Sequence, residues 1–105
     1  MFINRSELDG KVTFHIEGRL DTNNSPQLEE VLIPAFDHYN YIELDFADVD
    51  YISSAGLRVL LIGQKNAKSK QVKFTLINVP PVVMSVLTMT GFTEMLDVEA
   101  MKANA

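Results

Sequence analysis

The sequence predicts a small α/β domain in which a mostly parallel sheet of four to five strands carries helices on one face. Three runs alternate apolar and polar residues, at 11–17, 41–46 and 72–77, as half-buried strands do. Stretches with helical periodicity separate these runs, and this order implies right-handed crossovers onto a largely parallel sheet. With 105 residues, the chain can build one modest core. We therefore expect a single domain over residues 1–105.

The first two strands are expected to form a hairpin. The run KVTFHIE at 11–17 places its apolar side chains on one face and its polar side chains on the other. Asp9 and Gly10 precede it, and this pair favours a tight hairpin turn. Residues 2–8 are therefore predicted to form an antiparallel first strand. Because the clear strands are one-sided, we expect the helices on one face only.

The first helix follows from an apolar stripe with helical spacing, formed by Leu28, Val31, Leu32, Ala35 and Phe36. Ser25 is the expected N-cap, with Pro26 at the first helical position. Pro34 lacks an amide proton and should kink or end the helix.

Two further helices are predicted after the second and third alternating runs. Residues 54–69 are apolar almost all round for two turns, which is typical of a central helix covered on several sides. A third helix is expected from Pro81 to about Thr90, where the Gly91-Phe92 pair suggests a C-terminal cap. Residues 93–99 are expected to add a short edge strand.

Composition argues against several classes of function. The net charge of -5 and the sparse lysines and arginines disfavour nucleic-acid binding. The chain has no cysteine, which excludes disulfides, thiolate catalysis and cysteine-bound metals. The N-terminus has no basic-then-apolar signal pattern, and no apolar run approaches the roughly 20 residues that span a bilayer. We therefore expect a soluble, cytoplasmic protein without membrane insertion.

Two serines, Ser53 and Ser54, lie where an acidic loop is predicted to lead from the strand ending near Phe46 into the central helix. One interpretation is structural, because a serine N-cap stabilises a helix by about 1 kcal/mol. The other is functional, because free amides and the helix dipole favour an anion at this position. A phosphate there would add about 1.5 to 2 negative charges beside Asp48 and Asp50. The local pattern leaves both interpretations open.

Enzymatic alternatives lack their required partners. A serine hydrolase needs a base, but the two histidines, His15 and His38, belong to no motif and are expected to be solvated. A phosphate-binding loop needs glycines and a lysine before the serine, and DVDYISSAG has neither there. Asp48 and Asp50 have no third ligand at a usable spacing for a metal. We predict a protein that is not an enzyme and has neither metal nor cofactor.

Three motifs in order resemble the STAS domain family, in its small stand-alone form as the bacterial anti-sigma factor antagonist. They are GRLDTNNSPQLE at 18–29, DVDYISSAGLRVLL at 48–61 and NVPPVVMSVLTMTGF at 78–92. The second is similar to the family's Asp-Ser-Ser/Thr-Gly-Leu turn, and the third to its closing helix with Thr-Gly-Phe/Leu. The resemblance covers nearly the whole chain.

The resemblance implies a phosphorylation-controlled binding switch. The unmodified protein would bind an anti-sigma factor that is also a serine kinase of the histidine-kinase-like ATPase type, and this binding would release a sigma factor. The kinase would phosphorylate the turn serine with ATP, and a serine phosphatase would reverse that modification. The phosphate acceptor falls at Ser54, with Ser53 as the runner-up. The partner-binding residues implied in this way are Asp21, Thr22, Asn23, Asp48, Asp50, Ser53, Ser54, Gly56, Leu57 and Arg58.

The turn also departs from the family pattern. Ser53 stands where the family most often has aspartate, and Ala55 replaces its usual second Ser or Thr. The alternative function is therefore a non-phosphorylated STAS subunit, for example of a lipid-transport ATPase or a larger signalling assembly.

The third helix has more apolar residues than its core-facing positions require. Val82, Met84 and Met89 are left over. They are expected either to form a contact surface or to be buried under the termini or against Phe92.

Overall fold

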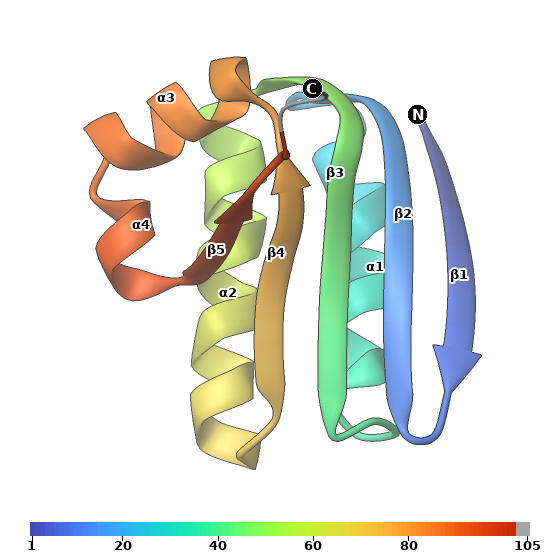
Figure 1. Cartoon of the computed structure of the whole chain (residues 1–105). Helices are drawn as coiled ribbons and strands as arrows, with labels where there is room; N and C mark the ends of the chain where they lie inside the picture. Colours follow the sequence, from blue (N-terminus) through green and yellow to red (C-terminus); the bar gives the residue numbers. More distant parts are fainter. Residues whose placement is uncertain (103–105) are drawn as a thin grey trace.

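The computed structural model describes residues 1–102, with five strands and four helices in that range (Figure 1). In chain order they are β1 (Phe2–Leu8), β2 (Lys11–Leu20), α1 (Ser25–Ala35), β3 (Tyr41–Ile52), α2 (Ser54–Lys70), β4 (Lys73–Val79), α3 (Pro81–Met89), α4 (Phe92–Met95) and β5 (Asp97–Ala100). The strands lie side by side in the order β1-β2-β3-β4-β5. β1 is antiparallel to β2, and the other neighbours are parallel. The predicted fold class, a mostly parallel sheet with an antiparallel first strand, is confirmed.

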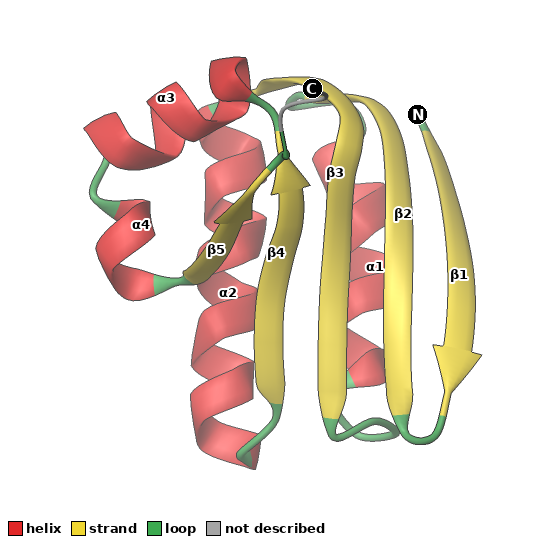
Figure 2. Cartoon of the chain, in the orientation of Figure 1, coloured by secondary structure: helices red, strands yellow, loops and turns green. Residues whose placement is uncertain are grey.

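The molecule has two layers, with α1 and α2 on one face of the sheet and the other face open (Figure 2). α3 and α4 lie on the β5 side of the molecule, at the left of the view. Alternate residues of β2, β3 and β4 enter the core between sheet and helices; among them are Val12, Phe14, Ile42, Leu44, Phe74 and Leu76. The prediction that helices cover one face is confirmed for α1 and α2. α4 was not predicted.

β3 is twice as long as predicted, because it continues past Phe46 to Ile52. The register of β2 against β3 shifts twice, once between His15 and Glu17 and again between Gly18 and Arg19. At each shift β3 contains one extra residue, which is the mark of a β-bulge. Phe46, Val49 and Ile52 are all buried, at a spacing of three. The bulges thus erase the period-two pattern on which the prediction depended.

The start of α1 also differs from the prediction. The N-cap is Asn24, and Ser25 is the first helical residue. Ser25 is buried, and its hydroxyl donates a hydrogen bond to the carbonyl oxygen of Asp21 (2.5 Å). Pro34 lies in the last turn and the helix ends at Ala35, as predicted.

α2 packs closely against the sheet because two of its residues are glycines. A Cβ atom on Gly63 would lie 3.0 Å from the Phe74 ring, and one on Gly56 would lie 2.8 Å from Ile52. The close approach fixes where the helix begins relative to β2 and β3. Within residues 1–102, none of the helices combines the length and apolarity needed to cross a bilayer.

Candidate functional site

The two adjacent serines have different environments. Ser53 has an extended backbone (φ -95°, ψ 176°) and caps α2, where its hydroxyl accepts a hydrogen bond from the Gly56 amide at 3.4 Å. Its own amide donates to the carbonyl of Leu20 at 2.8 Å, which fixes the turn to the end of β2. Ser54 is the first residue of the helix and is exposed. The cap role thus belongs to Ser53, and the free surface position belongs to Ser54.

A second loop, between β2 and α1, is built around Asp21. One carboxylate oxygen of Asp21 accepts hydrogen bonds from the amides of Asn23 and Asn24, both at 3.0 Å. The Asn24 side chain in turn accepts from the Asp21 amide at 2.9 Å. Asp21 is half-buried, while Thr22 and Asn23 are exposed. Asp21 therefore shapes the loop, and its neighbours form the accessible surface.

Both loops follow the carboxyl ends of neighbouring parallel strands, so they meet at one edge of the sheet. A groove of about 410 Å³ runs between the first turns of α1 and α2 beside them. Its lining comprises Thr22, Ser25, Pro26, Glu29, Ala55, Arg58 and Val59. The structure thus brings two of the three predicted segments together around a hollow in the surface.

The remaining predicted site residues fall into two groups. Asp48, Asp50 and Arg58 are exposed, and Leu57 is half-buried. Gly56 is buried and in contact range of Ile52 and Leu20, so the structure assigns it to packing under the turn instead of to the accessible surface.

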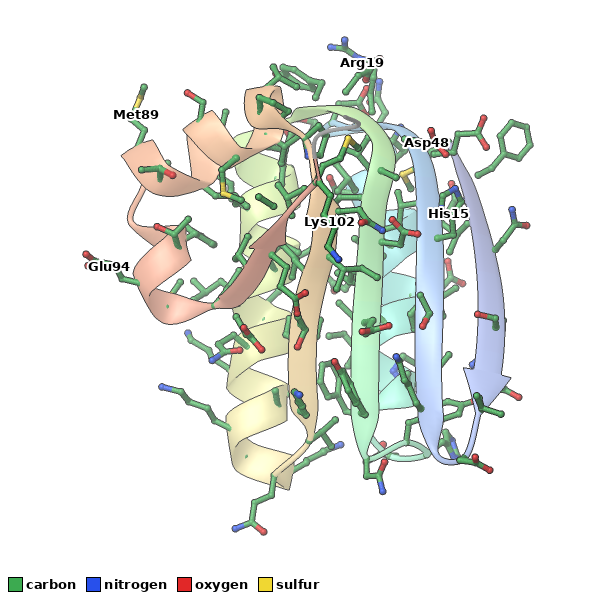
Figure 3. All side chains as sticks on the ribbon, viewed as in Figure 1. His15, Arg19, Asp48, Met89, Glu94 and Lys102 are labelled. Carbon is green, nitrogen blue, oxygen red and sulfur yellow. The ribbon has the colours of Figure 1, made fainter. Side chains whose placement is uncertain are left out.

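A contact between an arginine and a tyrosine beside the turn was not predicted. The guanidinium of Arg19 lies 4.1 Å from the centre of the Tyr51 ring, within the range of a cation–π contact. In Figure 3, Arg19 projects beyond the top of the sheet. The two residues are paired in register across β2 and β3. The pairing follows the second bulge, so alternation could not have revealed it.

A charged cluster lies on the open face of the sheet near the first bulge. His15 Nδ1 is 3.1 Å from a carboxylate oxygen of Asp45, and His15 Nε2 is 2.8 Å from one of Asp48. The expectation that His15 is merely solvated is wrong, because its side chain is 33% exposed and contacts two carboxylates. Figure 3 shows His15 and Asp48 together on β2 and β3. The signal that would have found them is the β2–β3 register.

The surroundings shift the pKa values of two members of this cluster. The hydrogen bond to Asp45 raises the pKa of His15, with Asp48 adding to the effect and partial desolvation opposing it. Partial burial acts to raise the pKa of Asp45. Hydrogen bonds from the Ala47 amide (3.0 Å), the Asn78 side chain (3.1 Å) and His15 together outweigh the effect of burial, so the pKa of Asp45 is lowered.

A second carboxylate on the open face is neutralised differently. Glu43 is buried, with 8% exposure. It accepts hydrogen bonds from the Thr13 hydroxyl (3.0 Å) and the Tyr41 hydroxyl (3.1 Å), and it pairs with Lys11 at 2.9 Å. Burial acts to raise the pKa of Glu43, but these three donors together lower it. Residues 1–102 contain no group of three His, Asp or Glu side chains arranged to hold a metal ion.

The surplus apolar residues of α3 have separate environments. Val82 is 57% exposed and Met89 is 83% exposed, and Figure 3 shows Met89 pointing away from the molecule. Met84 instead packs against the core. Burial under the termini or against Phe92 is therefore wrong for Val82 and Met89.

Comparisons with known proteins agree with this fold. The family described as the STAS domain matches residues 3–105. BtrV of Bordetella bronchiseptica, assigned by name as an anti-sigma factor antagonist, is 33% identical over 93 residues, which are 88% of this chain and 80% of that protein. The anti-sigma-B factor antagonist of Bacillus subtilis is 25% identical over 92 residues, covering 88% and 84%.

A solved structure extends the comparison to three dimensions. The structure of a Thermotoga maritima protein, likewise assigned as an anti-sigma factor antagonist, superposes with a TM-score of 0.86 at 23% identity, covering 92% of this chain and 85% of that one. The family match spans nearly the whole chain. The chain therefore belongs to the STAS domain family.

Proposed function

We propose that the chain is an anti-sigma factor antagonist controlled by phosphorylation of Ser54. The observation that carries the proposal is the difference between the two serines. Ser53 uses its hydroxyl to cap α2, while Ser54 is exposed on the first turn. The similarity to BtrV and to the Bacillus subtilis antagonist supports the class of function.

The proposed reaction is carried out by other proteins, and the chain itself is a binding partner and not an enzyme. An anti-sigma factor that is also a histidine-kinase-like ATPase would transfer the γ-phosphoryl group of ATP to Ser54. The Ser54 Oγ–P bond forms, the bond to the ADP oxygen breaks, and a base of the kinase takes the hydroxyl proton. A serine phosphatase would hydrolyse the phosphate. The first amides of the 17-residue α2 and its dipole favour the new charge locally.

The proposed partner surface combines the two loops and the exposed end of β3. Its accessible members are Thr22, Asn23, Asp48, Asp50, Ser54 and Arg58, with Asp21 and Ser53 half-buried behind them. The unmodified protein would bind the anti-sigma factor through this surface and so release the sigma factor. A phosphate would add about 1.5 to 2 negative charges beside two aspartates, which disfavours the complex.

One observation favours a second candidate, the non-phosphorylated STAS subunit of a transport ATPase or signalling assembly. Ser53 occupies the position where the family most often has an aspartate, and it serves as the helix cap. An acceptor without that neighbouring carboxylate is a departure from the phosphorylated pattern. In this alternative, the turn would bind its partner constantly.

The experiment is incubation of the chain with the cognate histidine-kinase-like ATPase and ATP, followed by intact-mass measurement and peptide mapping. Ser54→Ala should abolish phosphate incorporation and leave partner binding intact. Ser53→Ala is the matched control, since it removes the neighbouring hydroxyl and should still accept phosphate. Phosphate on Ser53 would refute the assignment of the acceptor. A stable complex with no phosphate on either serine would favour the second candidate.

A further inference from the structure

His15 bridges two carboxylates across the first bulge of β3. Its two ring nitrogens lie 3.1 Å from Asp45 and 2.8 Å from Asp48. In the β2–β3 register, His15 pairs with Asp45, and the next paired residue of β2, Glu17, pairs with Asp48. The imidazole therefore spans the extra residue of the bulge and joins its two sides.

The protonation state decides whether both contacts are favourable. A neutral imidazole has one N–H donor and one acceptor nitrogen, whereas the imidazolium has two donors. With both aspartates ionised, a neutral ring would hold a lone pair against one carboxylate. Only the protonated ring can donate to both. Two hydrogen bonds to ionised carboxylates therefore require the charged ring.

We propose that His15 is a proton-operated brace, which orders the acidic bulged segment 45–50 when charged and releases Asp48 when neutral. The segment leads directly to the serine turn, and Asp48 is a predicted member of the partner surface. As far as the partner is concerned, the inference rests on the proposed function. For the free protein, the inference does not depend on the proposed function.

The groups around His15 support a local charge balance. On β1, the residue opposite His15 is Asn4, which is uncharged. On β2, exposed Glu17 lies two residues along. On β3 are Asp45 and Asp48, and on β4 Asn78 donates to Asp45. Figure 3 shows one further cation, Lys102, over the same open face after β5. Two carboxylates, those of Asp45 and Asp48, therefore contact the ring, and both favour its charged form.

The first test is an NMR titration of the free protein from pH 5.5 to 9. We expect the His15 ring to titrate with a midpoint above 6.5 and the amides of 46–49 to shift with the same midpoint. His15→Gln should abolish the amide titration. Asp48→Asn should lower the ring midpoint and retain the fold. His38→Gln, which changes the exposed histidine after α1, is the matched control and should leave the amide titration unchanged. A His15 midpoint at or below 6.5, or amides that do not follow it, would overturn the proposal.

The second test measures affinity for the anti-sigma factor over the same pH range. The wild type and His38→Gln should bind about fivefold more weakly above the His15 midpoint than below it. His15→Gln should lack this component, which separates the brace from titrating groups of the partner. Parallel pH profiles for wild type and His15→Gln would show that the segment does not affect binding and would overturn the coupling. Absence of binding at every pH would refute the proposed function, while the titration of the free protein would still test the brace.

Discussion

Glu43 and Asp45 lie two residues apart on the open face of β3, yet they are neutralised in different ways. Glu43 is buried and pairs with Lys11, whose own pKa is raised by the hydrogen bond to Glu43. Asp45 pairs with His15, and this hydrogen bond raises the pKa of the imidazole from its usual value of 6.5. The pair near the start of β3 is therefore constant over the physiological range. The pair next to the serine turn contains a histidine, the side chain whose charge changes nearest to neutral pH, so it is the pair expected to respond to pH.

The largest effect is expected from adding charge at the serine turn. Phosphorylation of Ser54 should weaken the complex with the anti-sigma factor by about 2–5 kcal/mol, through repulsion and desolvation of a group without a counter-ion. Titrations at low and high ionic strength should show that salt recovers part of the affinity, because only the long-range repulsion is screened.

The control places a charge on the open face of the sheet, away from the serine turn. Ser6→Glu changes an exposed residue of β1 that pairs with Thr13. It should barely change affinity. An equal loss for Ser6→Glu and phosphorylated Ser54 would mean that net charge, and not the location of the serine, controls binding.

The next largest effect is expected when the pair of Glu43 and Lys11 is removed. Glu43→Ala leaves Thr13, Tyr41 and Lys11 without their shared acceptor and should lower the free energy of unfolding by about 1–3 kcal/mol. Urea denaturation at several pH values from 6 to 9 should give the same deficit throughout. The pKa of Glu43 is lowered, so its contribution is present above the unfolded value near 4.5 and is lost only at lower pH. Exposed Glu17→Ala should change stability by less than about 0.5 kcal/mol, and a similar loss for both variants would contradict the special role of Glu43.

The smallest effect is expected when the pair of His15 and Asp45 is removed. His15→Gln should lower the free energy of unfolding by about 1 kcal/mol at pH 6. The folded pKa of His15 is raised above 6.5, so its contribution is complete below 6.5 and is lost as pH rises through the folded value. Urea denaturation at pH 6 and pH 9 should therefore give a deficit that shrinks with pH. A deficit as constant as that of Glu43→Ala would show that the ring acts by packing alone.

The sequence predicted those parts of the fold in which side-chain period and backbone geometry agree. The regular halves of β2 and β3, the hairpin at Asp9 and the end of α1 at Pro34 all follow from local patterns. The second half of β3 was missed, because each bulge shifts the alternation by one residue. The cap of α1 was misplaced by one residue, because Asn24 and Ser25 are both favoured N-cap residues and the short-range hydrogen bonds of the Asp21 loop hold Asn24 at the cap.

The candidate site was predicted through its motifs, and its electrostatics were not. The turn serines and the loop at Asp21 stand out in the sequence. The contacts of His15 join residues 30 and 33 positions apart and depend on the register of two strands. The contact between Glu43 and Lys11 also depends on the register of these two strands. Pairing across a bulged sheet is a tertiary property, so these clusters required the structure.

The close packing of Gly56 has a consequence for how such a protein can diverge. Any side chain there would collide with Ile52 and Leu20, so the start of α2 would have to move off the ends of both strands. Thr22, Asn23 and Arg58, by contrast, have no such restriction, because they are exposed. If the proposed partner surface is correct, mutations there would alter which partner is recognised while the position of Ser54 stays fixed. In a duplicated copy of the gene, the exposed loop residues would be free to diverge, and the placement of the proposed acceptor would be inherited unchanged.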